Sequence, residues 1–185
     1  MDQVNVNPQD ILDTAILIHD ERVINQALDR LATEIGTVLA DAAPLVLCVM
    51  GGGVVFAGQL LPRLSFPLEF DYVQASRYHN RTEGMHLEWK VKPGENVRGR
   101  TVLVLDDILD EGYTLIEIKQ QCLHLGAKEV LLAVLVEKDL GRSKPITADF
   151  IGLTVPNQYV FGCGMDVYGW WRNLPAIYAL RSEVS

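Results

Sequence analysis

The fold is decided by residues 102–115, which read VLVLDDILDEGYTL. Four apolar residues of the β type precede the acidic pair Asp106 and Asp107, and Gly112 then leads into a helical pattern. Acidic residues this close to the end of a buried strand are costly unless a ligand or a metal ion meets them. The stretch therefore predicts a strand, a turn and a helix that together form a binding site.

The same turn places carboxylates beside free backbone N–H groups. Asp106 and Asp107 can accept hydrogen bonds from a sugar diol, while the amides of the turn and of the helix N-terminus can hold an anion. A ligand that carries a diol and a phosphate would use both, so the stretch predicts a ribose 5-phosphate site. An ordinary Asp-rich turn before a capped helix is the plainer interpretation of the same residues.

The composition fits one domain, residues 1–185, which is large enough for a substantial core. The formal net charge of −8 argues against broad electrostatic binding to nucleic acid or to anionic membranes, so a polyanionic substrate must be met locally by cations or by a metal ion. No apolar run reaches the roughly 20 residues of a membrane span, and no signal peptide is visible, so we expect a cytoplasmic protein. Cys48, Cys122 and Cys163 form no C-x-x-C pair and are interpreted as reduced thiols.

Helical and strand patterns alternate along the chain. We expect helices at 21–40, 54–61 and 114–125, and strands at 45–50, 68–75, 101–105 and 130–136. This alternation favours an α/β fold, a doubly wound, mainly parallel sheet flanked by helices, with ligands at the carboxyl ends of the strands. The part after Lys138 is less regular and richer in aromatic residues and glycine. We therefore expect a small hood formed by the N-terminal segment and roughly residues 138–185.

Other nucleotide-binding patterns fit less well. The chain has no Gly-Lys-Ser or Gly-Lys-Thr, one of which a P-loop requires. A dinucleotide fingerprint that began at Gly51 would need glycine at position 56, where Phe56 stands. Asp71 does lie about 20 residues beyond Gly51, as a ribose-binding acid should. A dehydrogenase therefore stays open as an alternative.

Residues 102–114 resemble the phosphoribosyl-pyrophosphate (PRPP) signature of the type I phosphoribosyltransferases. The resemblance narrows to the hypoxanthine-guanine phosphoribosyltransferase family and extends over nearly the whole chain. The other segments that carry it are 48–53, 77–78, 137–138, 149–152, 155–160, 162, 166 and 172–174. The resemblance implies a Mg²⁺-dependent transferase of purine salvage, which moves phosphoribosyl from PRPP to N9 of hypoxanthine or guanine and gives IMP or GMP plus pyrophosphate.

The resemblance also implies how the sugar, its phosphate and the metal ion are held. Asp106 and Asp107 would orient the ribose diol. Mg²⁺ would be held by Asp106, Asp107 and Asp166, the last by coordination or through water. The 5-phosphate would be wrapped by Glu111, Gly112, Tyr113 and Thr114.

The pyrophosphate would meet a glycine loop and two cations. By resemblance, Gly51 and Gly52 lie in a loop whose backbone approaches the pyrophosphate, and Met50-Gly51 is the candidate for a cis peptide bond. Arg172 and Arg77 would supply positive charge. A simple glycine turn, and a surface ion pair between Arg172 and an acid, are the structural alternatives.

The resemblance also implies which residues would form the purine site. Lys138 would donate to the exocyclic oxygen at position 6, Tyr159 would stack on the base, and Val160 would offer backbone groups to the base edge. Asp110 would face N7 as the general base or as a partner for its proton. Tyr78, in the polar segment 77–87, would belong to a lid that closes over the reacting centre.

Three positions depart from the family pattern, namely Glu111, Tyr113 and Gly51. A carboxylate that faced the phosphate would be repulsive, so we expect Glu111 to point away and to contribute only its N–H. The other two changes remove possible cations from pyrophosphate binding. A xanthine, orotate or other-base phosphoribosyltransferase and a regulatory nucleotide-sensing protein remain alternatives, and the family implies a homodimer or a homotetramer.

Overall fold

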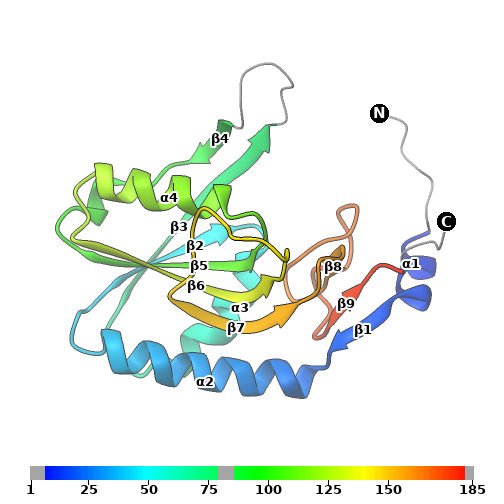
Figure 1. Ribbon diagram of the computed structural model, residues 1–185. Helices are drawn as coiled ribbons and strands as arrows, with labels where there is room; N and C mark the ends of the chain where they lie inside the picture. Colours follow the sequence, from blue (N-terminus) through cyan, green and yellow to red (C-terminus); the bar gives the residue numbers. More distant parts are fainter. Residues whose placement is uncertain (1–6, 79–85, 182–185) are drawn as a thin grey trace.

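The computed structural model describes residues 7–78 and 86–181, without the side chains of 76–78 and 86. Its centre is a six-stranded sheet of order β4-β3-β2-β5-β6-β7 (Figure 1). The strands are β2 (Leu45–Met50), β3 (Glu69–Tyr78), β4 (His86–Val91), β5 (Thr101–Leu109), β6 (Glu129–Lys138) and β7 (Phe150–Val155). All pairings are parallel except that of β4 with β3, so the predicted mainly parallel sheet is confirmed.

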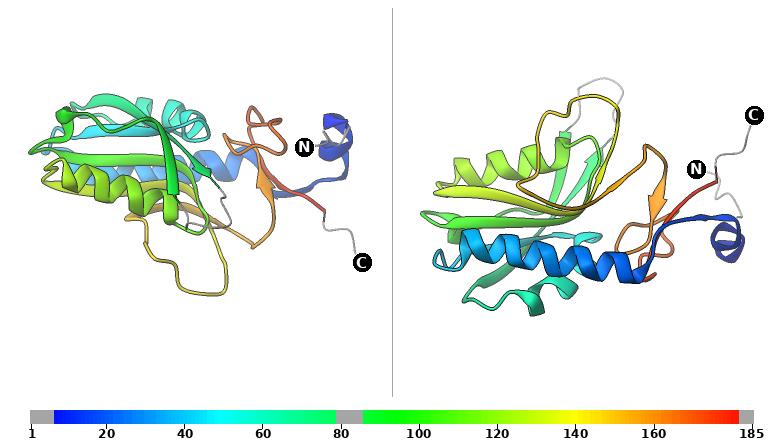
Figure 2. Two further views of the ribbon diagram at one scale, coloured as in Figure 1. Left: turned by 90° about the horizontal axis from the view of Figure 1, so that it is seen from above. Right: turned by 60° about the horizontal axis from the view of Figure 1, so that its bottom comes forward.

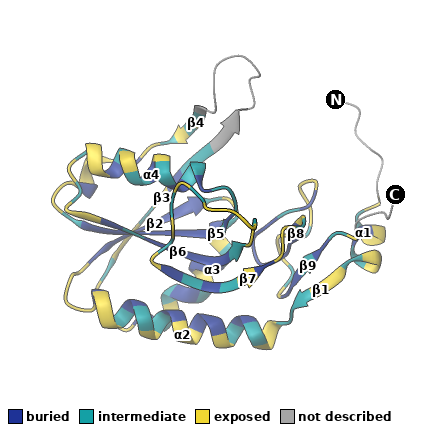
Figure 3. Cartoon of the chain, viewed as in Figure 1, coloured by how far each residue is buried: buried dark blue, intermediate teal, exposed yellow. Residues whose placement is uncertain are grey.

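Helices cover both faces of the sheet. α2 (Glu21–Leu39) and α3 (Gly53–Leu60), followed by the 3₁₀ turn η1 (Leu61–Arg63), cover one face, and α4 (Tyr113–His124) covers the other (Figure 2). Another 3₁₀ turn, η2 (Glu95–Val97), precedes β5. The central strands and the helix faces that pack on them are buried, as Figure 3 shows in dark blue. This doubly wound arrangement points the carboxyl ends of β5, β6 and β7 toward one end of the molecule.

A small hood stands at that end. It contains α1 (Pro8–Thr14) and a three-stranded antiparallel sheet of β1 (Ile16–His19), β9 (Ile177–Ala179) and β8 (Val160–Phe161). A separate apolar cluster, built on Ile11, Phe161 and Val167, holds the hood together. The first described residues of the chain and the last ones therefore meet in the hood (Figure 1).

The hood is smaller than the sequence predicted. Residues 150–155 were expected in the hood, yet they form β7 and extend the main sheet beside β6. Gly152 weakened the strand pattern, but the sheet needs glycine there because a Cβ would lie 2.4 Å from the carbonyl oxygen of Leu135.

β5 is longer than expected. The prediction ended this strand at Leu105, but the ladder with β6 continues through Asp106 to Leu109. The acidic pair therefore lies inside the strand and not beyond its end. β3 likewise runs on to Tyr78, whereas residues 79–85 and the side chains of Arg77 and Tyr78 lie outside the described part of the chain, so the predicted lid stays a prediction.

β7 forms one edge of the main sheet, and an arginine of α2 covers part of it. The Arg30 guanidinium donates from Nη2 to the carbonyl oxygen of Ile151 at 3.1 Å and also to that of Gly152. Nη1 of the same group donates to Glu34 Oε1 at 2.9 Å. Two carbonyl groups of the strand are thus bonded within the chain.

Candidate active site

The turn between β5 and α4 encloses a hollow of about 220 Å³. Its walls are Asp106, Ile108, Leu109, Asp110, Gly112, Thr114 and Leu115. Gly112 has a φ of +90°, a left-handed conformation that favours glycine, and a Cβ there would lie 2.8 Å from Ile146 Cγ2. The turn therefore leads the amides at the N-terminus of a twelve-residue helix toward the hollow, which suits a phosphate.

Asp106 and Asp107 are both buried, each with 8% of its surface exposed. Successive residues of a strand point to opposite faces, so Asp106 lines the hollow while Asp107 faces the loop after β2. The backbone N–H of Asp107 donates to Asp106 Oδ1 at 3.0 Å. Burial raises the pKa of the Asp107 carboxyl, and hydrogen bonds and the positive charge of Arg172 oppose that rise.

The loop after β2 passes close to Asp107 through glycine. The Met50-Gly51 peptide bond is cis, as the resemblance implied. A Cβ on Gly52 would lie 1.8 Å from Asp107 Oδ2, whereas a Cβ on Gly51 would have nothing within 4 Å. On its other side the loop meets the hood at Gly164, which has a φ of +105° and where a Cβ would lie 2.1 Å from the carbonyl oxygen of Gly52. Loop, strand and hood therefore converge at Gly52.

Asp110 and Lys138 meet where β5 and β6 end. Lys138 Nζ donates to Asp110 Oδ2 at 2.8 Å, with 12% of the lysine side chain and 35% of the aspartate side chain exposed. The two residues are 28 positions apart in the sequence, and the parallel strands bring them together. The residues predicted to act on N7 and on the 6-oxygen thus share one ion pair.

The hood brings Arg172 and Asp166 to the same end of the sheet. Arg172 Nη2 lies 2.6 Å from Asp166 Oδ1, and Nη1 donates to the carbonyl oxygen of Gly164 at 2.6 Å. Asp166 Oδ2 accepts from the N–H of Gly169 at 2.8 Å. Both carboxylate oxygens of Asp166 therefore have partners within the chain, and Asp166 holds Arg172 toward Asp107.

Tyr159 and Val160 lie in the hood, at the start of β8. Tyr159 is 51% exposed, and its ring stacks on that of Tyr168, with ring centroids 6.3 Å apart and an interplanar angle of 23°. Val160 is buried and pairs with Ala179 of β9, and the N–H of Leu180 donates to the carbonyl oxygen of Tyr159 at 2.9 Å. Burial, followed by the charge of Asp166, raises the pKa of Tyr159. Tyr159 therefore presents a fixed, half-exposed aromatic surface.

The departures from the family pattern also have a place in the structure. The Glu111 carboxylate lies 3.4 Å from Arg142 Nη2, and Glu111 is not among the residues that line the hollow. Tyr113 begins α4. No sequence pattern indicated Arg142 or Tyr168, because both lie on irregular segments. Their partners, Glu111 and Tyr159, are brought to them only when the chain folds.

Three carboxylates do not gather into a metal cage. Within residues 7–78 and 86–181, no group of three or more His, Cys, Asp or Glu side chains is placed to hold a metal ion. Asp106 and Asp107 point apart, and Asp166 is already paired. This donor set fits a magnesium ion that takes most of its ligands from a substrate and water, which is usual for Mg²⁺.

The three cysteine thiols are shielded from solvent, which suits packing and not nucleophilic chemistry. Cys48, Cys122 and Cys163 are buried and free, and burial raises their pKa values to about 11, 11 and 12. In the described part of the chain, every helix is too short or too polar to cross a membrane.

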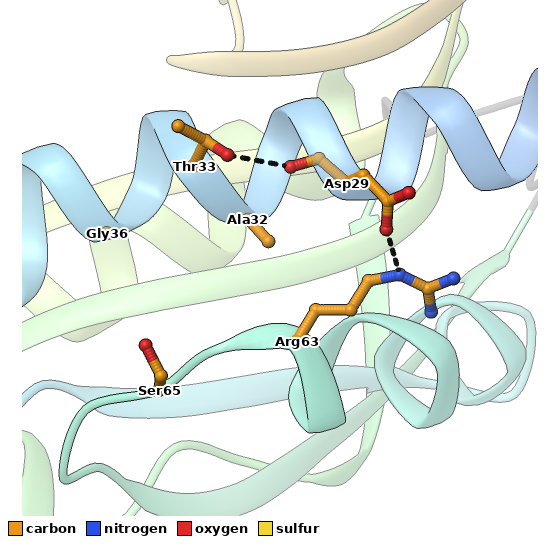
Figure 4. A pocket seen from close by; sticks show the side chains of 6 residues that line it. All are labelled: Asp29, Ala32, Thr33, Gly36, Arg63 and Ser65. Carbon is orange, nitrogen blue, oxygen red and sulfur yellow. Dashed lines mark hydrogen bonds and ion pairs between the residues drawn. The ribbon is translucent and has the colours of Figure 1, made fainter.

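A separate hollow of about 360 Å³ lies between α2 and η1 (Figure 4). Its one cation, Arg63, already lies 2.7 Å from Asp29 Oδ1 and donates to Asn25 Oδ1 at 2.8 Å. The hollow contains none of the residues predicted for the active site, and its charges are already matched.

Comparison with known proteins agrees with this geometry. Residues 17–168 match the family model described as phosphoribosyl transferase domain. The chain belongs to the phosphoribosyl transferase family. This match removes the dehydrogenase alternative.

Named relatives narrow the comparison further. The chain is 34% identical over 174 residues to the hypoxanthine-guanine phosphoribosyltransferase of Lactococcus lactis subsp. lactis, across 91% of this chain and 92% of that one. A solved hypoxanthine-guanine-xanthine phosphoribosyltransferase aligns with a TM-score of 0.78 at 30% identity, covering 92% of this chain and 99% of that one. The bifunctional protein TilS/HprT of Listeria monocytogenes serotype 4b is 35% identical over 170 residues, which are 91% of this chain and 26% of that longer protein.

Proposed function

We propose that the protein transfers phosphoribosyl from PRPP to N9 of hypoxanthine or guanine and releases pyrophosphate. The observation that carries the proposal is the ion pair of Asp110 and Lys138 at 2.8 Å, beside the hollow at the N-terminus of α4. An acceptor and a donor stand there next to a place for a sugar phosphate. The named relatives support the same reaction.

PRPP would lie along the carboxyl ends of the central strands. The hollow lined by Gly112 and Thr114 takes the 5-phosphate, and the buried carboxylates of Asp106 and Asp107 accept from the ribose diol. The pyrophosphate reaches the open backbone at Gly51 and the guanidinium of Arg172. A bound magnesium ion would neutralise the diphosphate charge, with Asp106 and Asp107 as the nearest protein carboxylates and Asp166 acting through water.

The purine would enter between the partners of the Asp110–Lys138 pair. An oxygen at position 6 accepts from Lys138 while a proton on N7 is offered to Asp110, so both charged groups keep a partner when their own contact opens. Adenine would present an amino group where Lys138 also donates, which leaves both donors unsatisfied. The half-exposed ring of Tyr159 would stack on the base.

Catalysis would then rest on positioning and on stabilisation of the leaving group. The sugar carbon becomes electron-poor as pyrophosphate departs, so a base held at the right distance and a cation on the diphosphate both lower the barrier. Asp110 takes up or balances the N7 proton as the N9 bond forms.

The test is pyrophosphate release from PRPP and Mg²⁺ with hypoxanthine, guanine, xanthine and adenine offered separately. We expect turnover with hypoxanthine and guanine and little with adenine. Turnover with xanthine alone would assign the other-base alternative. Binding of PRPP without transfer to any base would overturn the proposal in favour of the regulatory alternative.

A homodimer or homotetramer stays a prediction from the family resemblance, and a cytoplasmic location stays a prediction from the sequence, in which no signal peptide is visible. Sedimentation equilibrium of the purified chain tests the first, and fractionation of the source cells tests the second.

A further inference from the structure

A hollow of about 320 Å³ lies between the loop 139–149 and the ends of β6 and β7. Three cations line it, and each already has an acidic partner. The pairs are Lys138 with Asp110 at 2.8 Å, Arg142 with Glu111 at 3.4 Å, and Lys144 with Glu137 at 3.2 Å. Because the positive charges are matched, the hollow is poorly suited to a further anion. The pairs instead show how the loop is attached to the active site.

Lys144 is the most deeply buried of the three cations. Only 7% of its side chain is exposed, compared with 12% for Lys138. Burying an ammonium group is costly unless it is paired and hydrogen-bonded. Lys144 Nζ meets this condition, because it donates to the carbonyl oxygen of Leu109 at 3.0 Å and lies 3.2 Å from Glu137 Oε1.

The two partners of Lys144 stand directly before the catalytic pair. Leu109 and Glu137 face each other in the ladder of β5 and β6. The next residue on each strand is Asp110 on one side and Lys138 on the other. Lys144 Nζ therefore ties together the two strand ends from which Asp110 and Lys138 project.

The same loop also covers the phosphate turn. Ile146 lies against Gly112, where a Cβ would come within 2.8 Å of it, and the loop runs beside α4 (Figure 1). The buried ammonium group of Lys144 is thus the polar anchor of a segment that packs on the catalytic turn.

We propose that Lys144 is a positioning residue, which holds the Leu109 carbonyl and Glu137 so that Asp110 and Lys138 keep the separation that a purine requires. This inference rests on the proposed function. Lys144 would not touch the purine or PRPP. Its effect on the rate passes through Asp110.

The test compares Lys144→Met with Lys128→Met, the same substitution at an exposed lysine. Loss of positioning should lower kcat of Lys144→Met by roughly 10- to 100-fold, since small displacements of a catalytic group have effects of this size. The Michaelis constant for PRPP should stay close to that of the wild type, and Lys128→Met should match the wild type in both. Lys144→Arg should recover part of the loss because it keeps a charged donor.

A double-mutant cycle separates positioning from a general structural role. When Asp110 is already asparagine, Lys144→Met should cost less than about twofold, because residues that act through one another are not additive. An equal loss in both backgrounds, or a Lys144→Met enzyme that behaves as Lys128→Met does, would overturn the proposal. If Lys144→Met fails to fold, the double variant with Glu137→Gln removes the unpaired acid and serves in its place.

Hydrogen exchange gives a readout that does not depend on activity. The backbone amides of residues 109–112 should exchange faster in Lys144→Met than in Lys128→Met, and equal exchange rates would contradict the anchor. If the wild-type protein transferred phosphoribosyl to no base, the proposed function would be refuted. The comparison of amide exchange in Lys144→Met and Lys128→Met would still decide whether Lys144 holds the turn.

Discussion

Replacing Gly52 with alanine would test how firmly Asp107 is held. Gly52 has φ −66° and ψ −45°, a conformation that alanine adopts freely, so the backbone itself tolerates the change. The added Cβ would lie 1.8 Å from Asp107 Oδ2, about 1.6 Å short of the 3.4 Å at which ordinary contact begins. Because Asp107 is buried, its carboxylate must turn or the loop must shift.

The expected cost follows from this overlap. Forcing an extra methyl group into a packed site destabilises by about 1–3 kcal/mol, and the lower chain entropy of alanine offsets about 0.5–1 kcal/mol of this. A net loss of about 1–2 kcal/mol lowers the melting temperature by roughly 2–8 °C in a chain of this size. The displaced carboxylate also loses a hydrogen bond to the ribose diol, which should raise the Michaelis constant for PRPP about tenfold.

Gly58→Ala is the matched control, since Gly58 lies in α3, the helix that Gly52 precedes, and its Cβ would have nothing within 4 Å. This variant should gain about 0.5–1 kcal/mol and keep its activity. Thermal unfolding followed by circular dichroism and steady-state kinetics at varied PRPP give both quantities. A Gly52→Ala protein with the melting temperature of Gly58→Ala and an unchanged Michaelis constant would refute the reasoning.

Three further predictions concern the same site. Burial raises the pKa of Asp107, so the ionised carboxylate costs folding stability at any pH above that pKa. Asp107→Asn should therefore melt at a higher temperature than the wild type at pH 7 and bind PRPP more weakly. Its advantage in melting temperature should disappear as the pH falls toward the ordinary carboxyl pKa of about 3.9. An advantage that grew on acidification would show that the sign is wrong. Gly51→Lys should leave the melting temperature unchanged, because a Cβ there has nothing within 4 Å. It should lower the Michaelis constant for PRPP by up to about fivefold, which is the effect of one exposed ion pair. A raised Michaelis constant would count against pyrophosphate binding at this loop. Lys138→Ala should lower the ratio of kcat/KM for hypoxanthine to kcat/KM for adenine by about 10- to 100-fold, which corresponds to one charge-assisted hydrogen bond. An unchanged ratio would show that Lys138 does not recognise the base.

Local patterns made much of the fold predictable. The strand, turn and helix around Gly112 are encoded within fourteen residues, so the sequence alone placed Asp106, Asp110 and Thr114 around one hollow. Gly52 was also found locally, because a glycine run directly after a buried strand indicates a close backbone approach.

What the sequence could not show depends on contacts between distant segments. β5 continues past Leu105 because β6 pairs with it as far as Leu109, and this pairing overrides the cost of burying Asp106 and Asp107. β7 was missed because Gly152 interrupts the strand pattern for the sake of packing against Leu135. Lys144 stands before a proline in a polar segment and has the pattern of a surface residue, and only the folded chain encloses it.

The arginine on α2 that bonds to β7 has a consequence for how copies of the chain behave together. An edge strand with free carbonyl groups is a template on which another polypeptide can add a strand. Arg30 donates to two adjacent carbonyl oxygens of β7, and because neighbouring carbonyls of a strand alternate in direction, one of them lies on the free side, where the guanidinium places a bulky charged group. We therefore expect Arg30 to hinder intermolecular strand pairing, and a chain without this guanidinium to scatter more light in concentrated samples while its turnover stays close to that of the wild type.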